Sequence, residues 1–344
     1  MENKAVWLQG PGKEPWVSSA PVPEPGPGEL LLRIKGVAVQ PGEWKIQAGL
    51  IPVPLTYPTI IGRKLQFSCS GVVEKVGSGI TRFAPGDRVA TNTTGVLKND
   101  SRFGAYQRFA LTPQVLTSKI GNTSFDVAAS LSTAYSSMSA LFIHLNLERP
   151  PSKGQAAPRA EKVLIWGISS SFGALAAQLA QQAGYEVVGV AAGRHSELAR
   201  SFGLDHFVDR KSSSVVQELT ALGPYKAVFA GQDSAEDQVK MGQVLAAHGG
   251  GRILSAAGIQ PGVVFPAGVS GFFQQYLDDF LDPQNKDFVE WVWWDYLEAA
   301  ITDGRLKSVP LEVMEGLSHT TEAWDLLRHH KVGGKRIIIV PESE

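Results

Sequence analysis

The clearest pattern of hydrophobic positions in the chain lies between Glu161 and Arg194, and it predicts one βαβ unit. Its parts are an apolar strand, a turn of small residues, a helix with leucines four residues apart and a second apolar strand, at residues 162–166, 167–173, 174–183 and 185–190. Gly184 ends the helix, because glycine readily adopts the conformation that closes one. The unit has the length of a dinucleotide-binding motif.

The turn of this unit, GISSSFG at residues 167–173, is a candidate phosphate site. Backbone N–H groups at a helix N-terminus attract a pyrophosphate, and small residues let it approach closely. The usual pattern has three glycines, as G-x-G-x-x-G, whereas Ser169, Ser170 and Ser171 fill the middle here. Serine still permits close approach, and its hydroxyl can donate to a phosphate oxygen. A plain α/β crossover that binds nothing is the alternative.

The pattern differs on the two sides of this unit. Short alternating stretches between Gly and Pro turns fill the first part of the chain, including predicted strands at 72–76 and 83–89, and indicate a small barrel. An Ala/Ser-rich segment then predicts two helices divided near Ser132. After the unit, strands alternate with helices and predict a doubly wound parallel sheet. The aromatic-rich stretch 270–303 is interpreted as a helix packed in a core or an interface.

Composition places the chain among globular proteins of two-domain size. It has 344 residues, of which 43% are hydrophobic and 19% charged. A net charge of -1 gives no reason to expect binding to nucleic acid or to an anionic membrane. The N-terminal residues lack the apolar core of a signal peptide, and no stretch approaches the length of a membrane span. A cytoplasmic protein is therefore expected.

Metal ligands are scarce. The single cysteine, Cys69, excludes an intrachain disulfide and a four-cysteine zinc site. The seven histidines form no H-E-x-x-H pattern, and the adjacent His329 and His330 would point to different faces of a helix. We therefore expect no metal.

The end of the second strand of the βαβ unit indicates which cofactor binds. In an NAD site an acidic residue at this position binds the ribose 2′-hydroxyl. This chain has Arg194 and His195 there, with Arg210 and Lys211 beyond the next strand. Cations at this position accommodate a 2′-phosphate through charge-assisted hydrogen bonds, which favours NADPH. The alternative is that Arg194 caps a helix or lies in solvent.

Six short motifs are spread along the chain: PGPGE at 25–29, QPGEWK at 40–45, GVVEKVG at 71–77, RFAPGDRV at 82–89, VLIWGISSS at 163–171 and VGGK at 332–335. Together they resemble the medium-chain dehydrogenase/reductase superfamily. The resemblance is greatest to its zinc-independent branch of quinone-reductase-like proteins and fungal stand-alone, trans-acting enoyl reductases of polyketide assembly. The resemblance covers nearly the whole chain. It implies an α/β fold in which a GroES-like β-rich catalytic domain, 1–125 and 275–344, flanks a Rossmann domain, 126–274.

The resemblance also bears on zinc. Zinc-dependent members carry a cysteine ligand after the first strands and a Gly-His-Glu motif near Gly62. This chain has Val39-Gln-Pro-Gly-Glu and Gly62-Arg-Lys at those places. Zinc-free relatives usually have Gly-Ser-Asp-x-x-Gly-x-Val after a Y-P-x-I-x motif. Here Tyr57-Pro-Thr-Ile-Ile-Gly62 is followed by RKLQFSCS before Gly71, so the Asp is missing and about four residues are inserted. The insertion could reshape the pocket or alter the ancestral chemistry.

The resemblance assigns a catalytic role to Lys45. The stand-alone enoyl reductases carry an N-P-x-D-W-K motif, which Gln40-Pro-Gly-Glu-Trp-Lys45 matches in form. The lysine is then the proton donor or the anchor of the substrate carbonyl. A cation near that oxygen stabilises the enolate that forms when hydride adds to the β-carbon. Without the motif, a solvated surface lysine would be the favoured interpretation.

The remaining site residues come from the same resemblance. The implied cofactor contacts are Trp44, Lys45, Ser169, Ser170, Ser171, Phe172, Gly193, Arg194, His195, Ser196, Arg210, Ala256, Ala257, Val332 and Gly333. The implied substrate contacts are Tyr57, Ser132, Tyr135, Ser136 and Ser139, and helix packing is the alternative role of these serines.

These observations predict an NADPH-dependent, zinc-independent reductase of a conjugated carbon–carbon double bond. Its expected substrate is a small molecule, including a carrier-protein-bound polyketide, with no nucleic acid or membrane partner. Two alternatives stay open: a non-redox cyclase or synthase partner on the same fold, and a general quinone reductase. A monomer and a homodimer both fit.

Overall fold

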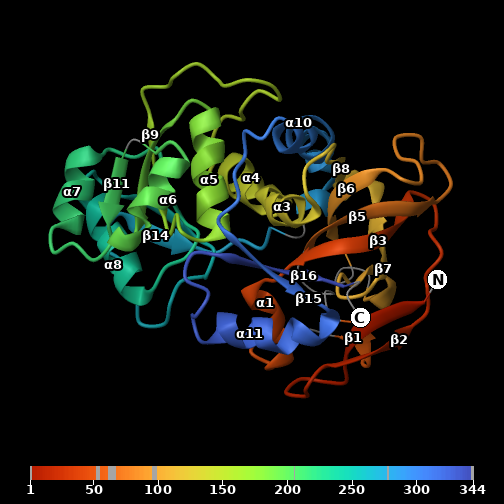
Figure 1. Cartoon of the computed structure of the whole chain (residues 1–344). Helices are drawn as coiled ribbons and strands as arrows, with labels where there is room; N and C mark the ends of the chain where they lie inside the picture. The colour runs from red at the N-terminus through yellow and green to blue at the C-terminus, as the bar shows by residue number, and fades with distance from the viewer. Residues whose placement is uncertain are drawn as a thin grey trace. The chain divides into compact units, whose positions relative to one another are not determined.

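The computed structural model describes residues 2–51, 55–60, 67–94, 99–204, 206–276 and 279–341. The chain forms two compact units, coloured along the sequence in Figure 1. Unit 1 comprises residues 1–133, 283–305 and 310–344, and unit 2 comprises residues 134–282 and 306–309.

These divisions fall later in the chain than the boundaries 125/126 and 274/275 expected from the sequence. Helix α3, Phe125–Leu131, packs against strands β3, Glu29–Ala38, and β5, Phe67–Val76, and so belongs to unit 1. The hydroxyl of Ser70 in β5 donates a hydrogen bond to the carbonyl oxygen of Phe125 at 2.6 Å. The Ala/Ser-rich sequence shows that this segment is helical, whereas its partners determine its unit.

Unit 1 is built on two sheets. Its other strands are β1 (Asn3–Leu8), β2 (Trp16–Ala20), β4 (Thr59–Ile60), β6 (Arg88–Thr93), β7 (Phe109–Pro113), β8 (Thr117–Lys119), β15 (Leu311–Glu315) and β16 (Arg336–Val340). A seven-stranded sheet has the order β15-β16-β3-β5-β6-β8, with β7 also paired to β3, and a three-stranded sheet has the order β2-β1-β4. Ile338 of β16 pairs with Ala38 of β3, so the two ends of the chain share one sheet.

One predicted strand of unit 1 begins later than expected. The sequence predicts a strand over 83–89, but β6 begins at Arg88. The carboxylate of Asp87 accepts a hydrogen bond from the backbone N–H of Ala84 at 3.0 Å, and Gly86 has φ of +93°. This turn occupies the first half of the predicted strand. Pro-Gly-Asp is a sequence that favours a turn, although the apolar residues on both sides of it suggested a strand.

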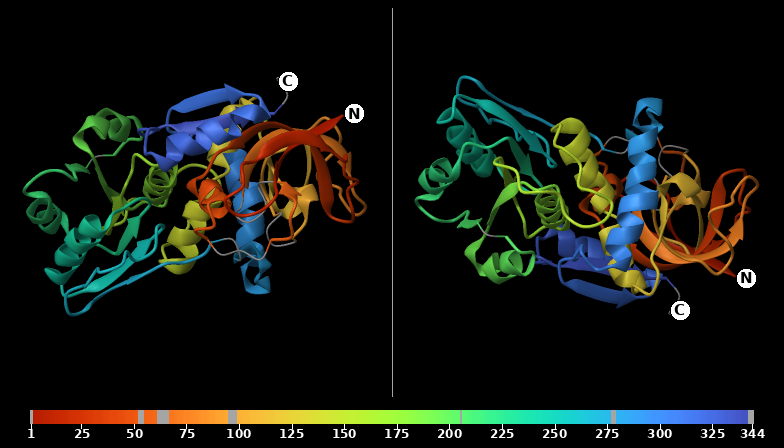
Figure 2. Two further views of the ribbon diagram at one scale, coloured as in Figure 1. Left: turned by 90° about the horizontal axis from the view of Figure 1, so that it is seen from below. Right: turned by 90° about the horizontal axis from the view of Figure 1, so that it is seen from above.

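Unit 1 contains one long continuous helical segment that is rich in aromatic residues. Helix α9 (Lys286–Glu290), a π-helical segment (Trp291–Tyr296) and α10 (Leu297–Thr302) follow one another without a break, as Figure 2 shows. Trp293 and Tyr296 are fully buried, which confirms the prediction of a helix packed in a core for this part of the stretch. Besides α3, the described part of unit 1 contains the helices α1 (Pro41–Gln47) and α11 (Thr320–Arg328), which pack on one another.

Unit 2 is a six-stranded parallel sheet with helices. Its strands are β9 (Lys162–Trp166), β10 (Glu186–Ala191), β11 (His206–Asp209), β12 (Ala227–Ala230), β13 (Gly251–Ser255) and β14 (Val269–Phe272), in the order β11-β10-β9-β12-β13-β14. Numbered along the chain, this order is 3-2-1-4-5-6, that of a dinucleotide-binding fold. The central strands β9, β10 and β12 are mostly apolar and buried because both faces of such a sheet are covered. The predicted fold class is confirmed.

The helices of unit 2 are short except for two. They are α4 (Ala134–Met138), a π-helical segment (Ser139–His144), α5 (Ser171–Gln182), α6 (Ser196–Ser201), α7 (Val215–Leu222) and α8 (Ala235–Ala246). The chain order of this sheet reverses between β9 and β12, and ligands of such folds bind where the carboxyl ends of these strands diverge. The turn before α5 lies at that point.

Candidate functional site

The turn between β9 and α5 has the close packing that a phosphate-binding turn needs. Gly167 has φ of +81°, and a Cβ atom there would lie 2.5 Å from the carbonyl oxygen of Gln232. A Cβ at Gly173 would overlap the carbonyl oxygen of Gly167, and a Cβ at Gly231 would lie 2.6 Å from the backbone nitrogen of Gly173. The three glycines therefore let the ends of β9 and β12 and the first turn of α5 meet at backbone distance.

The serines of this turn differ in their availability. Ser170 caps α5: its hydroxyl accepts a hydrogen bond from the N–H of Gly173 at 3.0 Å and donates to the carbonyl of Gly167 at 2.8 Å. Its hydroxyl is thus used inside the turn. Ser171 and Phe172 occupy the first turn of α5, where backbone N–H groups have no partner within the helix. The donors that this turn can offer a pyrophosphate therefore include main-chain N–H groups, which fits a dinucleotide.

Phe172 is fixed by ring contacts on both sides. Its ring packs edge-on against Phe229 of β12 at 5.0 Å between centroids and against Tyr276 at 5.3 Å. The hydroxyl of Ser137 donates to the carbonyl of Phe172 at 3.0 Å. If Phe172 contacts the cofactor, as predicted, the contact would be made by its main chain, because its ring packs against Phe229 and Tyr276 and anchors the turn.

The turn after β10 brings cationic side chains together. Gly193–His195 forms one turn of 3₁₀ helix, in which Arg194 is exposed and His195 partly buried. The pKa of His195 is lowered, first by its partial burial and then by the positive charges of Arg194 and Arg210. These three predicted cofactor contacts follow the carboxyl ends of β10 and β11, which are parallel neighbours, so they lie at the same edge of the sheet. Ser196 follows as the first residue of α6.

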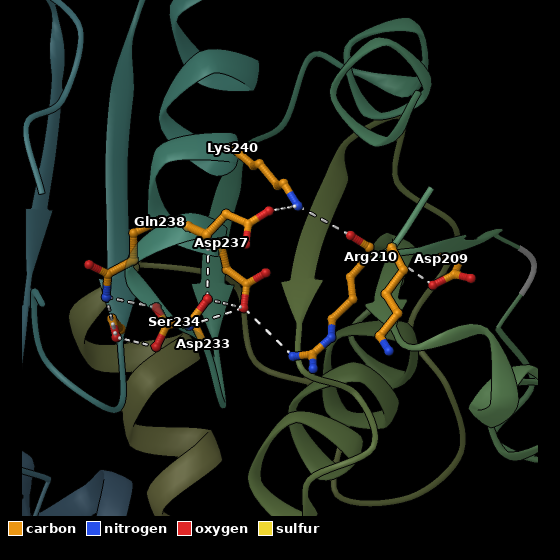
Figure 3. Close-up of polar contacts among 10 residues, drawn as sticks. Asp209, Arg210, Asp233, Ser234, Asp237, Gln238 and Lys240 are labelled. Carbon is orange, nitrogen blue, oxygen red and sulfur yellow. Dashed lines mark hydrogen bonds and ion pairs between the residues drawn. The ribbon is translucent and has the colours of Figure 1, made fainter. Parts of the chain in front are cut away.

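Two acidic residues that the sequence reasoning missed follow β12, and one of them, Asp237, lies beside Arg210. Figure 3 shows Arg210 extending toward Asp237, and the guanidinium Nη1 lies 3.7 Å from its carboxylate Oδ2. Asp233 lies at the end of β12 and accepts hydrogen bonds from Gln238 at 2.9 Å and from Ser255 at 3.1 Å. Burial raises the pKa of Asp233. The Ser-x-x-Asp spacing of a capping box was the available sequence signal for Asp237.

The predicted contacts Ala256 and Ala257 form the turn after β13. The N–H of Ala256 donates to the carbonyl of Ala230 at 2.9 Å, and the N–H of Ala257 donates to the hydroxyl of Ser255 at 3.2 Å. Ala256 is half-buried and Ala257 exposed. This turn lies at the same edge of the sheet as the glycine turn, because β12 and β13 are parallel neighbours.

The predicted substrate residues of unit 2 lie on one helical segment. Tyr135 and Ser139 are fully buried, and Ser136 is half-buried. The hydroxyl of Ser139 donates to the carboxylate of Asp279, which also lies 3.0 Å from Nε2 of His144. Ser136 is therefore the serine of this segment that a ligand can reach most easily.

Three of the predicted residues of unit 1 share one hydrophobic core. Trp44, Tyr57 and Val332 pack against the same apolar core. Lys45 is half-buried, with its Nζ 5.9 Å from the ring centroid of Trp44. The exposed Gly333 follows Val332 and has φ of +58°.

Ser132, also in unit 1, is fully buried, and its hydroxyl donates to the carbonyl of Ala129 at 2.9 Å. This backbone contact is the helix-packing role that the sequence left open for the serines.

Glu43, two residues before Lys45, was not expected to matter. It is 2% exposed, and its carboxylate accepts hydrogen bonds from the Tyr106 hydroxyl and, at 2.9 Å, from the Trp324 indole. Burial raises its pKa to about 8, although both hydrogen bonds and the charge of Arg336 act in the other direction. This carboxyl group anchors α1, which carries Trp44 and Lys45.

The altered segment after Gly62 lies outside the described residues as far as Gln66. Cys69 falls in β5, where burial raises its pKa. Among residues that the structure describes, no cluster of three or more His, Cys, Asp or Glu side chains is arranged to hold a metal ion. The described helices include none with the length and apolar character needed to cross a membrane.

Comparisons with known proteins agree with this architecture. Residues 26–122 match the family Alcohol dehydrogenase GroES-like domain. The trans-enoyl reductase tazE of Aspergillus terreus (strain NIH 2624 / FGSC A1156) is 34% identical over 228 residues, which cover 63% of this chain and 72% of that protein. The trans-enoyl reductase himH of Aspergillus japonicus is 29% identical over 324 residues, which cover 92% of this chain and 91% of that protein.

A solved structure shows the same fold. The quinone oxidoreductase of Pseudomonas syringae pv. Tomato DC3000 is 21% identical, matches 99% of this chain and 100% of its own, and has a TM-score of 0.75. The GroES-like match, the Rossmann strand order and the relatives confirm the resemblance stated from the motifs. The chain belongs to the medium-chain dehydrogenase/reductase superfamily, and it is an oxidoreductase whose fold implies a nicotinamide cofactor.

Proposed function

We propose that this protein is an NADPH-dependent, zinc-independent enoyl reductase of fungal secondary metabolism. Two relatives at 34% and 29% identity are named trans-enoyl reductases, which supports the reaction class. One structural observation carries the choice of cofactor: Arg194 and His195 follow β10, and Arg210 follows its parallel neighbour β11, with the Arg210 N–H donating to the carbonyl of Ala191 in β10. NADPH carries a dianionic phosphate on its ribose, which these side chains would bind, whereas NADH has only a hydroxyl group at that position.

The residues of unit 2 fit the rest of this cofactor. The first turn of α5 would bind the pyrophosphate through main-chain N–H groups, and the three glycines would let it approach the backbone. The turn at Ala256 and Ala257 would border the nicotinamide half. When bound, NADPH supplies a hydride to the β-carbon of the unsaturated substrate.

The residues of unit 1 would provide the acid. The ammonium group of Lys45 would stabilise the negative charge that develops on the substrate carbonyl oxygen, or donate the proton that completes reduction. Its helix is held through the buried Glu43, so Lys45 is presented from a rigid support. Tyr57 and Ser136 are the predicted substrate contacts with partial exposure.

The substrate is proposed to be a polyketide-derived thioester, free or on a carrier protein. The protein would act as a monomer or a homodimer. A cytoplasmic location goes with this proposal, and the buried, unpaired thiol of Cys69 suits a reducing compartment.

Purified protein tests the proposal directly. We expect consumption of NADPH with an α,β-unsaturated thioester, a saturated product by mass spectrometry, and tighter binding of NADPH than of NADH. Product formation that does not require NADPH would support a cyclase instead. Consumption of NADPH with simple quinones but not with the thioester would support the quinone reductase alternative.

A further inference from the structure

Arg210 and Asp237 form an ion pair in which only the cation reaches solvent. The Arg210 side chain is 39% exposed and that of Asp237 is 7% exposed. Nη1 of Arg210 lies 3.7 Å from Oδ2 of Asp237, which is an ion-pair distance and longer than a hydrogen bond. The ion pair therefore does not occupy the N–H donors of the guanidinium, which can still bind another anion.

The carboxylate of Asp237 is fixed independently of Arg210. It accepts hydrogen bonds from the backbone N–H of Ser234 at 3.0 Å and from its hydroxyl at 2.9 Å. The Ser234 hydroxyl in turn accepts from the N–H of Asp237 at 3.2 Å, which completes a capping box at the start of α8. Asp237 is therefore a fixed carboxylate with which the partly exposed Arg210 side chain pairs.

The main chain of Arg210 is held as well. Its N–H donates to the carbonyl of Ala191, the last residue of β10, at 2.9 Å. Its carbonyl accepts from the ammonium of Lys240 at 3.4 Å, and Lys240 pairs with Glu236 at 2.7 Å (Figure 3). Arg210 is thus tied to β10 at its backbone and to α8 at both its backbone and its side chain.

We propose that Asp237 is a positioning residue that sets the preference for NADPH over NADH by holding the Arg210 guanidinium at the carboxyl edge of the sheet, where β10 and β11 end. This inference rests on the proposed function, and adds to it a residue that does not touch the cofactor. A free arginine side chain loses rotamer entropy when it binds a phosphate, whereas one already held by Asp237 loses less. The phosphate therefore meets a preorganised donor.

The primary test is Asp237→Asn, measured by dissociation constants for NADPH and NADH from cofactor fluorescence. Asparagine keeps an oxygen that can accept from Ser234, so the capping box survives while the charge that holds Arg210 is removed. We expect NADPH affinity to fall roughly tenfold and NADH affinity to stay unchanged, because only the phosphate uses Arg210. Unchanged or stronger preference for NADPH in this variant would overturn the inference.

Glu161→Gln is the control for charge. It removes one negative charge from the same unit, but Glu161 pairs with Lys226 at 2.8 Å just before β9 and β12, whereas Arg210 follows the carboxyl end of β11. We expect its ratio of NADPH to NADH affinity to match that of the unmodified protein. An equal loss of preference in both variants would mean that Asp237 acts by charge at a distance, which contradicts positioning.

Arg210→Ala and the double variant test whether Asp237 acts through Arg210. We expect Arg210→Ala to lose most of the preference, and Asp237→Asn to have no further effect in that background. Additive losses would contradict the inference. Should Asp237→Asn fail to fold, Asp237→Glu keeps the charge and cap but displaces the carboxylate by one methylene, and we expect it to weaken the preference as well.

The two proposals fail in different ways. Equal binding of NADPH and NADH by the unmodified protein would overturn the proposed cofactor choice, and the role of Asp237 with it. A clear preference for NADPH that Arg210→Ala abolishes and Asp237→Asn leaves intact would overturn only the role of Asp237.

Discussion

The carboxylate of Glu43 accepts a hydrogen bond from the indole N–H of Trp324 at 2.9 Å, across 281 positions of sequence. It joins α1, near the beginning of the chain, to α11, near its end. The Tyr106 hydroxyl donates to the same oxygen, and the rings of Tyr106 and Trp324 pack edge-on at 6.4 Å. Lys45 therefore lies on a seven-residue helix whose anchor is a carboxyl group fully removed from water.

The stability of the protein should depend on pH through Glu43. Its pKa rises from an ordinary value of 4.5 in the unfolded chain to about 8 in the folded one, because burial disfavours the charged form. Between these two values the folded state binds one proton more than the unfolded state, so stability falls as pH rises through this window. Glu43→Gln keeps an acceptor for Trp324 and cannot ionise. We expect urea unfolding to show a smaller loss of stability from about pH 5 to about pH 8 in this variant, by on the order of 2–4 kcal/mol.

Glu24→Gln provides the control for this measurement. Glu24 pairs with Lys75 at 2.6 Å, but its side chain is 72% exposed. We expect its pH dependence to match that of the unmodified protein, because an exposed pair contributes little to stability. The same steep pH dependence in Glu43→Gln as in the unmodified protein would show that another buried group titrates.

Replacement of Lys45 should separate chemistry from cofactor binding. Lys45→Met removes the ammonium, and we expect kcat for an unsaturated thioester to fall roughly 100-fold or more, with the dissociation constant of NADPH little changed. Lys45→Arg should retain part of the activity if the side chain anchors the carbonyl, and little if it donates the proton, since arginine stays protonated. Lys75→Met, on β5, is the control and should leave kcat unchanged. Weak NADPH binding by Lys45→Met with unimpaired turnover at saturation would contradict the assigned role.

The sequence is most informative where a local pattern determines the structure. The βαβ unit was predictable because its apolar strands, its small-residue turn and the glycine after its helix all lie within about 30 consecutive residues. The cationic turn at Arg194 and His195 followed from its place at the end of a strand. The confirmed parallel sheet follows from the same alternation of strand and helix.

Contacts between residues far apart in the sequence could not be predicted. Glu43 lies inside a recognised motif, yet its burial depends on Tyr106 and Trp324, which no local pattern connects to it. The hydroxyl of Ser139 is likewise engaged by Asp279, 140 positions away. In each case the side chain has a partner that becomes adjacent only in the folded chain, so its role could not be read from neighbouring residues.

The glycine turn should not tolerate a side chain at Gly173. A methyl group there would overlap the carbonyl oxygen of Gly167, so Gly173→Ala must displace α5 from the end of β9. We expect a loss of roughly 2 kcal/mol or more in the free energy of unfolding and weaker binding of both NADPH and NADH. Gly10→Ala is the control, because a Cβ at Gly10 meets only a Lys13 side-chain atom at 3.9 Å. Normal cofactor binding by Gly173→Ala would show that the turn does not contact the pyrophosphate.

The pH dependence of cofactor binding should report on His195. Burial and the charges of Arg194 and Arg210 lower its pKa in the free protein, so its ring is mainly neutral at neutral pH. A bound 2′-phosphate would offset those charges and favour the protonated ring, so NADPH affinity should rise as pH falls from about 8 to about 6, while NADH affinity should not. His195→Gln removes the imidazole ring, so the pH profile of the variant reports only the titration of the phosphate. The difference between the two profiles then gives the contribution of His195. Identical pH profiles for the variant and the unmodified protein would show that His195 does not face the phosphate.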